Sequence, residues 1–95
     1  MGFEWDEAKK RLNLKKHGID FEDAREVFDS PILSALDTRE DYGEDRWIAI
    51  GVIRSIVVVI AFTERGSESV RIISARKATK NEKEKYHKQI KNQLR

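Results

Sequence analysis

The chain has 95 residues and a formal net charge of +2, and its length supports one domain, residues 1–95, built on a single small core. Hydrophobic residues make up 39% and charged residues 38%, a globular composition, and the absence of cysteine excludes disulfides and thiolate metal sites and fits a reducing cytoplasm. No basic segment followed by an apolar one opens the chain, and its longest apolar run is too short to cross a bilayer, so we expect neither a signal peptide nor a membrane partner.

Two helices are predicted near the N-terminus. The first covers residues 6–17 and is followed by Gly18, a residue that favours helix termination. Its apolar residues recur at helical spacing: Trp5, Ala8 and Leu12. Asp20 can cap the second helix, which Pro31 ends. The expected apolar face of that helix consists of Phe21, Ala24, Val27 and Phe28.

Four strands are predicted after these helices. They cover residues 32–36, 47–53, 55–62 and 70–75. The run 55–62 is continuously apolar and rich in β-branched residues, which is typical of a central strand covered on both faces. Arg54 and Ser55 form a tight link before it, and Gly66 marks the turn to the last strand. Residues 37–45 are polar and are expected to form a loop.

A final helix is predicted to begin at Thr79, which can form a Thr-x-x-Glu capping box with Glu82. Its apolar stripe is thin and consists of Tyr86, Ile90 and Leu94. We expect Tyr86 to pack in the core and the helix as a whole to dock weakly. The sequence therefore predicts an α+β fold with two N-terminal helices, a four-stranded, mainly antiparallel twisted sheet, and a C-terminal helix.

Charge is unevenly distributed along the chain. Residues 20–46 contain ten acidic and three basic residues, whereas residues 76–95 contain eight basic and two acidic residues. This asymmetry suggests a basic face for a polyanion and an acidic face for a basic protein. For any single charge, simple solvation is the better explanation.

Arginines on or beside the predicted strands are the main candidate site residues. Arginine is always protonated and bidentate, and a strand holds its side chain in a fixed orientation, which suits phosphate oxygens. Arg76, Arg65 and Arg46 are therefore the candidates for stabilising a phosphate in a transition state. Strand alternation places Arg71 on the opposite face from Arg76 unless the strand breaks near Ala75, so we expect only an ion pair from Arg71.

Acid–base groups are few. His17 is a catalytic candidate because histidine is the side chain whose charge changes nearest neutral pH, although a structural role at the helix end explains it equally well. Candidate RNA-binding residues are Lys16, Lys77 and Lys80. The acidic residues of the loop 37–45 lack an ordered ligand spacing, so we expect no metal and no other cofactor.

Much of the chain lies in three segments, FEWDEAKKRLNLKKHGIDFEDAREVFD, GEDRWIAIG and TERGSESVRIISARKATKNEKEKY. Together they resemble the BrnT family of type II toxins over nearly the whole chain. The resemblance implies a fold similar to the RelE-type ribonuclease toxins. It also implies a BrnA-like antitoxin with a ribbon-helix-helix DNA-binding domain, so that DNA would be contacted only indirectly.

The residues and the resemblance together predict an endoribonuclease toxin that works without a metal. RNA supplies its own nucleophile, the 2′-hydroxyl, and the protein must add a base, positive charge at the phosphate and an acid at the leaving 5′-oxygen. The alternative is a non-catalytic module of the same fold that binds nucleic acid or protein, because acid–base candidates are few. We expect the antitoxin to contact the basic face at Arg76, Lys77, Lys80 and Tyr86.

Overall fold

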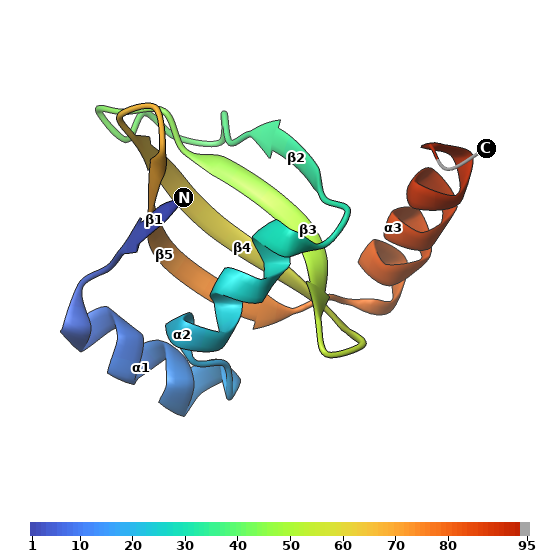
Figure 1. Ribbon diagram of the computed structural model, residues 1–95, viewed down its shortest axis with the longest axis horizontal. Coiled ribbons are helices and arrows are strands. Elements are labelled where there is room, and N and C mark those ends of the chain that lie inside the picture. Colours follow the sequence, from blue (N-terminus) through green and yellow to red (C-terminus); the bar gives the residue numbers. More distant parts are fainter. Residues whose placement is uncertain (94–95) are drawn as a thin grey trace.

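The computed structural model describes residues 1–93 and shows a five-stranded sheet accompanied by helices (Figure 1). The strands are β1 (Gly2–Glu4), β2 (Leu33–Leu36), β3 (Trp47–Ile53), β4 (Ile56–Arg65) and β5 (Ser69–Lys77). The helices are α1 (Glu7–His17), α2 (Phe21–Ala24), the 3₁₀ helix η1 (Arg25–Asp29) and α3 (Lys80–Gln93). The α+β class is confirmed. Among the described residues, no helix is long and apolar enough to cross a membrane.

The prediction of a four-stranded sheet is wrong because the short strand β1 adds a fifth. The sheet order is β1-β5-β4-β3-β2, and β1 runs parallel to β5 while the other neighbouring pairs are antiparallel. Phe3 aligns with Val70, near the other end of the chain. A three-residue strand is too short to show an alternating pattern, so sequence periodicity does not detect it.

Helix α1 has the predicted ends but not the predicted buried face. Asp6 accepts hydrogen bonds from the backbone N–H groups of Ala8 and Lys9, and Gly18 ends the helix in the left-handed conformation at φ 72°. Leu12, expected on the apolar face, is 66% exposed. The one buried residue of the helix is the polar Asn13.

Asn13 joins α1 to the sheet through its side-chain amide. It donates hydrogen bonds of 2.9 Å to the carbonyl oxygens of Ile19 and Ala75, and it accepts one of 3.1 Å from the N–H of Ala75. The amide thus takes the place of a neighbouring strand at the edge of β5, beyond the end of β1. Helix α1 is therefore attached to the sheet by a hydrogen-bonded polar side chain rather than by an apolar stripe.

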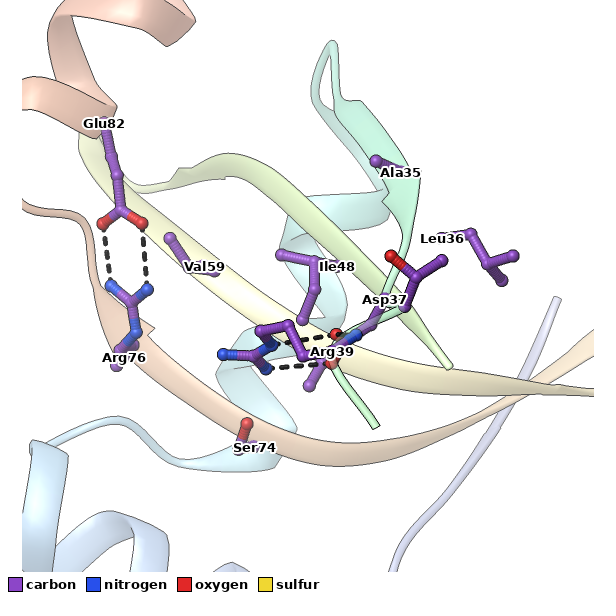
Figure 2. Close-up of a pocket in the computed structure, with 11 residues that line it drawn as sticks. Ala35, Leu36, Asp37, Arg39, Ile48, Val59, Ser74, Arg76 and Glu82 are labelled. Atoms are coloured by element: carbon purple, nitrogen blue, oxygen red, sulfur yellow. Dashed lines mark hydrogen bonds and ion pairs between the residues drawn. The ribbon is translucent and has the colours of Figure 1, made fainter. Parts of the chain in front are cut away.

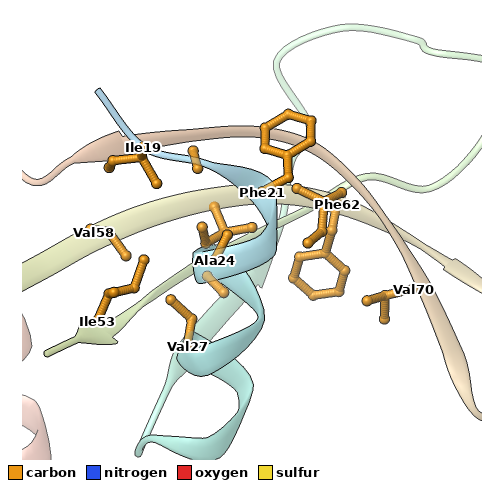
Figure 3. Close-up of a cluster of buried hydrophobic side chains, with 12 residues drawn as sticks. Ile19, Phe21, Ala24, Val27, Ile53, Val58, Phe62 and Val70 are labelled. Carbon is orange, nitrogen blue, oxygen red and sulfur yellow. The ribbon is translucent and has the colours of Figure 1, made fainter. Parts of the chain in front are cut away.

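The hydrophobic core lies between the α2–η1 segment and one face of the sheet (Figure 3). The helical side chains in it include Phe21, Ala24 and Val27, all fully buried. The strands contribute Ala49, Ile53, Val58, Ile60, Phe62, Val70, Ile72 and Ala75. Gly51 permits the close approach of η1 to β3, because a Cβ atom there would lie 2.7 Å from Val27 Cγ1. The predicted second helix and its apolar face are therefore confirmed, although its second half is a 3₁₀ helix.

The link between β3 and β4 consists of Arg54 and Ser55, as predicted. Both residues have positive φ angles, 46° and 74°, which are typical of the primed turns that match the twist of a hairpin. The strand that follows, β4, lies in the middle of the sheet order, and residues 57–60 are all buried. The expectation of a central strand covered on both faces is confirmed.

Strand β5 contains one extra residue. Phe62 of β4 pairs with Ile72, whereas the preceding Ala61 pairs with Ser74, so Ile73 has no partner in β4. Such a β-bulge interrupts the alternation of side chains along a strand.

The bulge changes which face the β5 arginines occupy. Arg71 pairs with Thr63 and Arg76 pairs with Val59, and these two β4 residues lie four positions apart. Because directly paired residues share a face, both arginines point to the same side of the sheet. The expectation of opposite faces, which held only for a strand unbroken near Ala75, is wrong because the bulge at Ile73 interrupts the strand. We call this side, away from α2 and η1, the outer face.

Helix α3 begins with the predicted capping box, in which Thr79 N–H donates to Glu82 and Glu82 N–H donates to Thr79 Oγ1. The helix packs against β2 and β3. Tyr86 is 3% exposed, and its hydroxyl donates a 2.5 Å hydrogen bond to the carbonyl oxygen of Pro31. Its expected core role is confirmed, and the buried ring offers no surface to the antitoxin, which corrects that expectation. Leu94 lies outside the described residues.

Candidate functional site

A hollow of about 400 Å³ opens on the outer face, between β2, the loop after it and the start of α3 (Figure 2). We call it the outer-face hollow. Aliphatic side chains from three strands line it: Ala35, Ile48, Val59 and Ala61. Charged side chains line it as two pairs: Arg76 with Glu82, and Arg39 with Asp37. Guanidinium and carboxylate groups therefore face a shared, partly apolar space.

Arg76 is held by two parallel hydrogen bonds to Glu82. Its Nη1 and Nη2 atoms lie 2.8 and 2.9 Å from the two carboxylate oxygens. Glu82 also accepts the N–H of Thr79 at 2.8 Å, so the capping box orients the carboxylate that orients the guanidinium. The sequence does not reveal the pairing of Arg76 with Glu82, because the capping box alone accounts for a glutamate at position 82.

The second pair lies in the loop after β2. Arg39 binds Asp37 through Nε at 2.8 Å and Nη2 at 2.9 Å, and the Tyr42 hydroxyl donates to the same carboxylate at 3.1 Å. The Asp37 side chain is 3% exposed and that of Arg39 is 75% exposed. Asp37 is therefore the anchor, and Arg39 is the group that a ligand can reach. Sequence analysis missed Arg39 because nothing in a polar loop distinguishes one arginine from its neighbours.

The pairing fixes the charge of all four groups. The hydrogen bonds from Arg76 lower the pKa of Glu82 to about 2, and those from Arg39 hold the pKa of Asp37 well below its usual range. The same contacts raise the pKa of Arg76 and of Arg39. Because an effective general base has a pKa near the working pH, neither carboxylate suits that role at neutral pH.

Glu82→Gln is expected to make the free energy of unfolding depend less on pH in the acid range. The folded-state pKa of Glu82 lies below its ordinary 4.5, so its ionic contribution is fully present above about pH 4.5 and is lost as the pH falls toward about 2. The free energy of unfolding, measured by urea titration across this range, should fall more steeply for the native chain than for the variant. Glu84→Gln, an exposed change on the same helix, is the control; identical slopes for the native chain and Glu82→Gln would contradict the pairing.

The other arginine candidates lie outside the hollow. Arg65 pairs with Glu4 at 3.4 Å and with Glu44 at 3.3 Å. Arg65 lies six residues along β4 from Val59, the residue that pairs with Arg76, and this corresponds to roughly 20 Å at the rise of a β-strand. The Arg46 guanidinium lies 4.1 Å from the ring centroid of Tyr42, and its buried Nε has no hydrogen-bond partner in the part of the chain that the structure describes. Arg71 lies 3.7 Å from Glu4, which confirms the expected ion pair.

The histidine and lysine candidates are distributed around the hollow rather than in it. His17 and Lys16 line a separate groove beside α1, and Ser74 lines both that groove and the outer-face hollow. Lys77 lines a third depression near the α1–α2 connection, and Lys80 is exposed at the start of α3. Of the seven candidate residues, only Arg76 lies in the hollow.

Metal ligands are not grouped in the part of the chain that the structure describes. Among residues 1–93, no three His, Cys, Asp or Glu side chains come together in a way that could hold a metal ion. In the outer-face hollow, the guanidinium groups of Arg76 and Arg39 are the groups that can bind an anion.

Comparisons with known proteins agree on one family. The sequence model described as "Ribonuclease toxin, BrnT, of type II toxin-antitoxin system" matches residues 5–82. Among solved structures, the chain is similar to the 1.1 Å crystal structure of the Brucella abortus ribonuclease toxin BrnT. The two are 35% identical with a TM-score of 0.65, over 84% of this chain and 99% of that one. A search of curated protein sequences finds no match.

Proposed function

The chain belongs to the BrnT family of ribonuclease toxins from type II toxin–antitoxin systems, and we propose that it is a metal-independent endoribonuclease. The observation that carries the proposal is the Arg76 guanidinium, held at the wall of the outer-face hollow by Glu82. The Glu82 carboxylate binds both terminal nitrogens of the Arg76 guanidinium and so occupies the position that two phosphate oxygens would take. In the proposed complex with RNA, the scissile phosphate takes over some of the hydrogen bonds that the Arg76 guanidinium makes to Glu82.

The reaction uses the nucleophile that RNA already carries. The 2′-oxygen attacks the adjacent phosphorus and passes its proton to a base, and the bond from phosphorus to the 5′-oxygen breaks as that oxygen takes a proton from an acid. The products are a 2′,3′-cyclic phosphate and a 5′-hydroxyl. Arg76 stabilises the negative charge that develops on the phosphate oxygens, and Arg39 faces the same space from the other wall.

The remaining candidates are assigned supporting roles. Arg65 and Arg46 are proposed to bind the RNA backbone away from the reacting phosphate, since neither lines the hollow. Further backbone contacts are proposed for Lys16, Lys77 and Lys80. His17 is the proposed acid or base, and the reacting nucleotide must then approach it past Ser74, the residue shared by the hollow and the adjoining groove.

Cleavage of RNA by the purified chain is expected to persist in excess EDTA. The described residues do not gather a metal-ligand set, and arginine supplies the positive charge that a metal would otherwise provide. The measurement is the initial rate of cleavage of a defined RNA with EDTA or with added Mg²⁺. Loss of activity in EDTA that Mg²⁺ restores would contradict the proposed mechanism.

A non-catalytic module remains the second candidate function. The observation that favours it is that the carboxylates in the outer-face hollow are poor bases at neutral pH. Such a module would bind RNA without producing new ends. Incubation of the purified chain with labelled RNA, followed by separate measurement of bound and cleaved fractions, distinguishes the two functions.

A type II toxin acts together with an antitoxin, and we propose a BrnA-like ribbon-helix-helix protein as the partner. DNA would then be bound by the antitoxin and not by this chain. The proposed location is the cytoplasm, where both RNA and antitoxin are present. Expression of the chain should arrest growth in cells that lack the antitoxin, and growth should resume when the antitoxin is supplied.

A further inference from the structure

A groove of about 660 Å³ runs between α1 and the edge of β5. We call it the α1 groove. Leu12 of α1 and Ile73 of the β5 bulge provide its apolar surface. Its basic residues all come from α1: Lys9, Lys15, Lys16 and His17. Among residues 1–93, no aspartate or glutamate lines the groove.

The apolar surface of the groove is incompletely covered by residues 1–93. Leu12 is 66% exposed because Asn13, rather than a leucine, attaches α1 to the sheet. Ile73 is only partly buried, since it is the extra residue of the bulge and has no pair in β4. A helix in a soluble domain normally turns its leucines toward the core, so an exposed leucine beside an isoleucine indicates a contact surface.

The positive charges around the α1 groove indicate which kind of ligand it binds. Lys9, Lys15 and Lys16 place ammonium groups around an apolar strip, and lysine stems extend that strip while their charges remain in water. RNA satisfies the ammonium groups through its phosphates, but it has no aliphatic side chains to cover Leu12 and Ile73. A peptide segment with acidic residues on one side and aliphatic residues on the other satisfies both requirements.

We propose that the α1 groove binds an acidic, amphipathic segment of the antitoxin, an inference that rests on the proposed toxin function. Aliphatic side chains of the segment contact Leu12 and Ile73, and its carboxylates pair with Lys9, Lys15 and Lys16. Ser74 lines both the groove and the outer-face hollow, so a bound segment lies against the strand that carries Arg76. It also covers His17, the proposed acid or base.

The test compares two exposed leucines of the same helix. Leu12→Glu places a carboxylate in the groove, whereas Leu14→Glu makes the same change at a 45%-exposed residue that does not line it. The probe is the cognate antitoxin, purified from its complex with the chain, and the readout is the dissociation constant. Leu12→Glu should weaken binding by about 30-fold or more, the scale of a lost interface hot spot, and Leu14→Glu by less than about 3-fold.

A second variant tests the charges independently of the apolar contact. Lys15→Glu should slow association with the antitoxin, and the difference from the native chain should shrink as salt rises. Equal antitoxin affinity for the native chain, Leu12→Glu and Lys15→Glu would overturn the proposal. Weakened RNA binding with unchanged antitoxin binding would overturn it in favour of RNA as the occupant.

Cleavage by the free variants separates this proposal from the proposed function. Leu14→Glu should cut RNA at the native rate in the absence of antitoxin, and circular dichroism should show the native fold for both variants. If Leu12→Glu loses antitoxin binding while even the native chain cuts no RNA, the groove assignment is supported and the ribonuclease proposal is contradicted.

Discussion

Arg76→Ala is expected to lower the rate of RNA cleavage by about 100-fold or more, the scale of removing one preorganised donor from a transition state. Arg76 is the only one of the candidate residues that lines the outer-face hollow, and Glu82 holds both ends of its guanidinium group. The measurement is the initial rate of cleavage of a defined RNA by the purified variant. Circular dichroism and thermal melting should first establish that the variant is folded, because the change also leaves Glu82 without its partner.

Arg65→Ala is the matched control for this experiment. It removes another arginine that faces the same side of the sheet, roughly 20 Å along β4 and paired with Glu4 and Glu44. We expect a smaller loss of activity, of the size that follows from losing one contact to the RNA backbone. A folded Arg76→Ala variant that cleaves RNA at the native rate would show that the outer-face hollow is not the catalytic site.

Asn13→Ala is expected to lower the free energy of unfolding by about 2–4 kcal/mol, a large effect for a single polar side chain. The change leaves the N–H and carbonyl of Ala75 and the carbonyl of Ile19 without their present partners. Burying an unsatisfied polar group costs more than the net value of the hydrogen bond it made. Urea unfolding of the native chain and the variant measures the difference.

Leu12→Ala is the control for Asn13→Ala, because Leu12 is the neighbouring residue and is 66% exposed. Its effect on the free energy of unfolding should stay within about 0.5 kcal/mol, as for other surface changes. If Asn13→Ala were no more destabilising than Leu12→Ala, the attachment of α1 to β5 through the amide would be wrong.

The fold was largely predictable from local signals. The caps at Asp20, Gly18 and Thr79 and the two-residue link at Arg54 each depend on residues close together in the chain, and all are present. The buried run in β4 likewise has a clear signature in its β-branched residues. The family assignment made from the sequence is confirmed by the match over residues 5–82 and by the similar crystal structure.

The features that sequence analysis missed depend on distant partners. Strand β1 has only three residues and pairs with β5 across nearly the whole chain, and Asn13 finds its partner at Ala75. The bulge at Ile73 reverses the alternation that placed Arg71 and Arg76 on opposite faces. No local pattern records where a strand gains an extra residue, because the partner strand determines it.

The sequence predicts that arginines form the candidate site, but it does not predict which residues lie together there. An arginine on a strand near the last helix made Arg76 a candidate, and the structure places Glu82 and the loop pair of Asp37 and Arg39 around the same hollow. The pair of Asp37 and Arg39 depends on how the loop after β2 folds over the sheet, and the contact of Glu82 depends on where α3 begins. Residue type alone does not distinguish Arg39 from Arg65, because both are arginines near strands.

In the proposed reaction, this chain cleaves RNA through attack of the RNA's own 2′-hydroxyl without a metal. The most direct test is cleavage of one RNA, in EDTA, with and without a single 2′-deoxy substitution at the nucleotide before the scissile bond. We predict that the unmodified RNA yields a 2′,3′-cyclic phosphate and a 5′-hydroxyl, and that the substituted RNA is not cut at that bond. Cleavage of the substituted RNA at the same bond and rate would contradict the account.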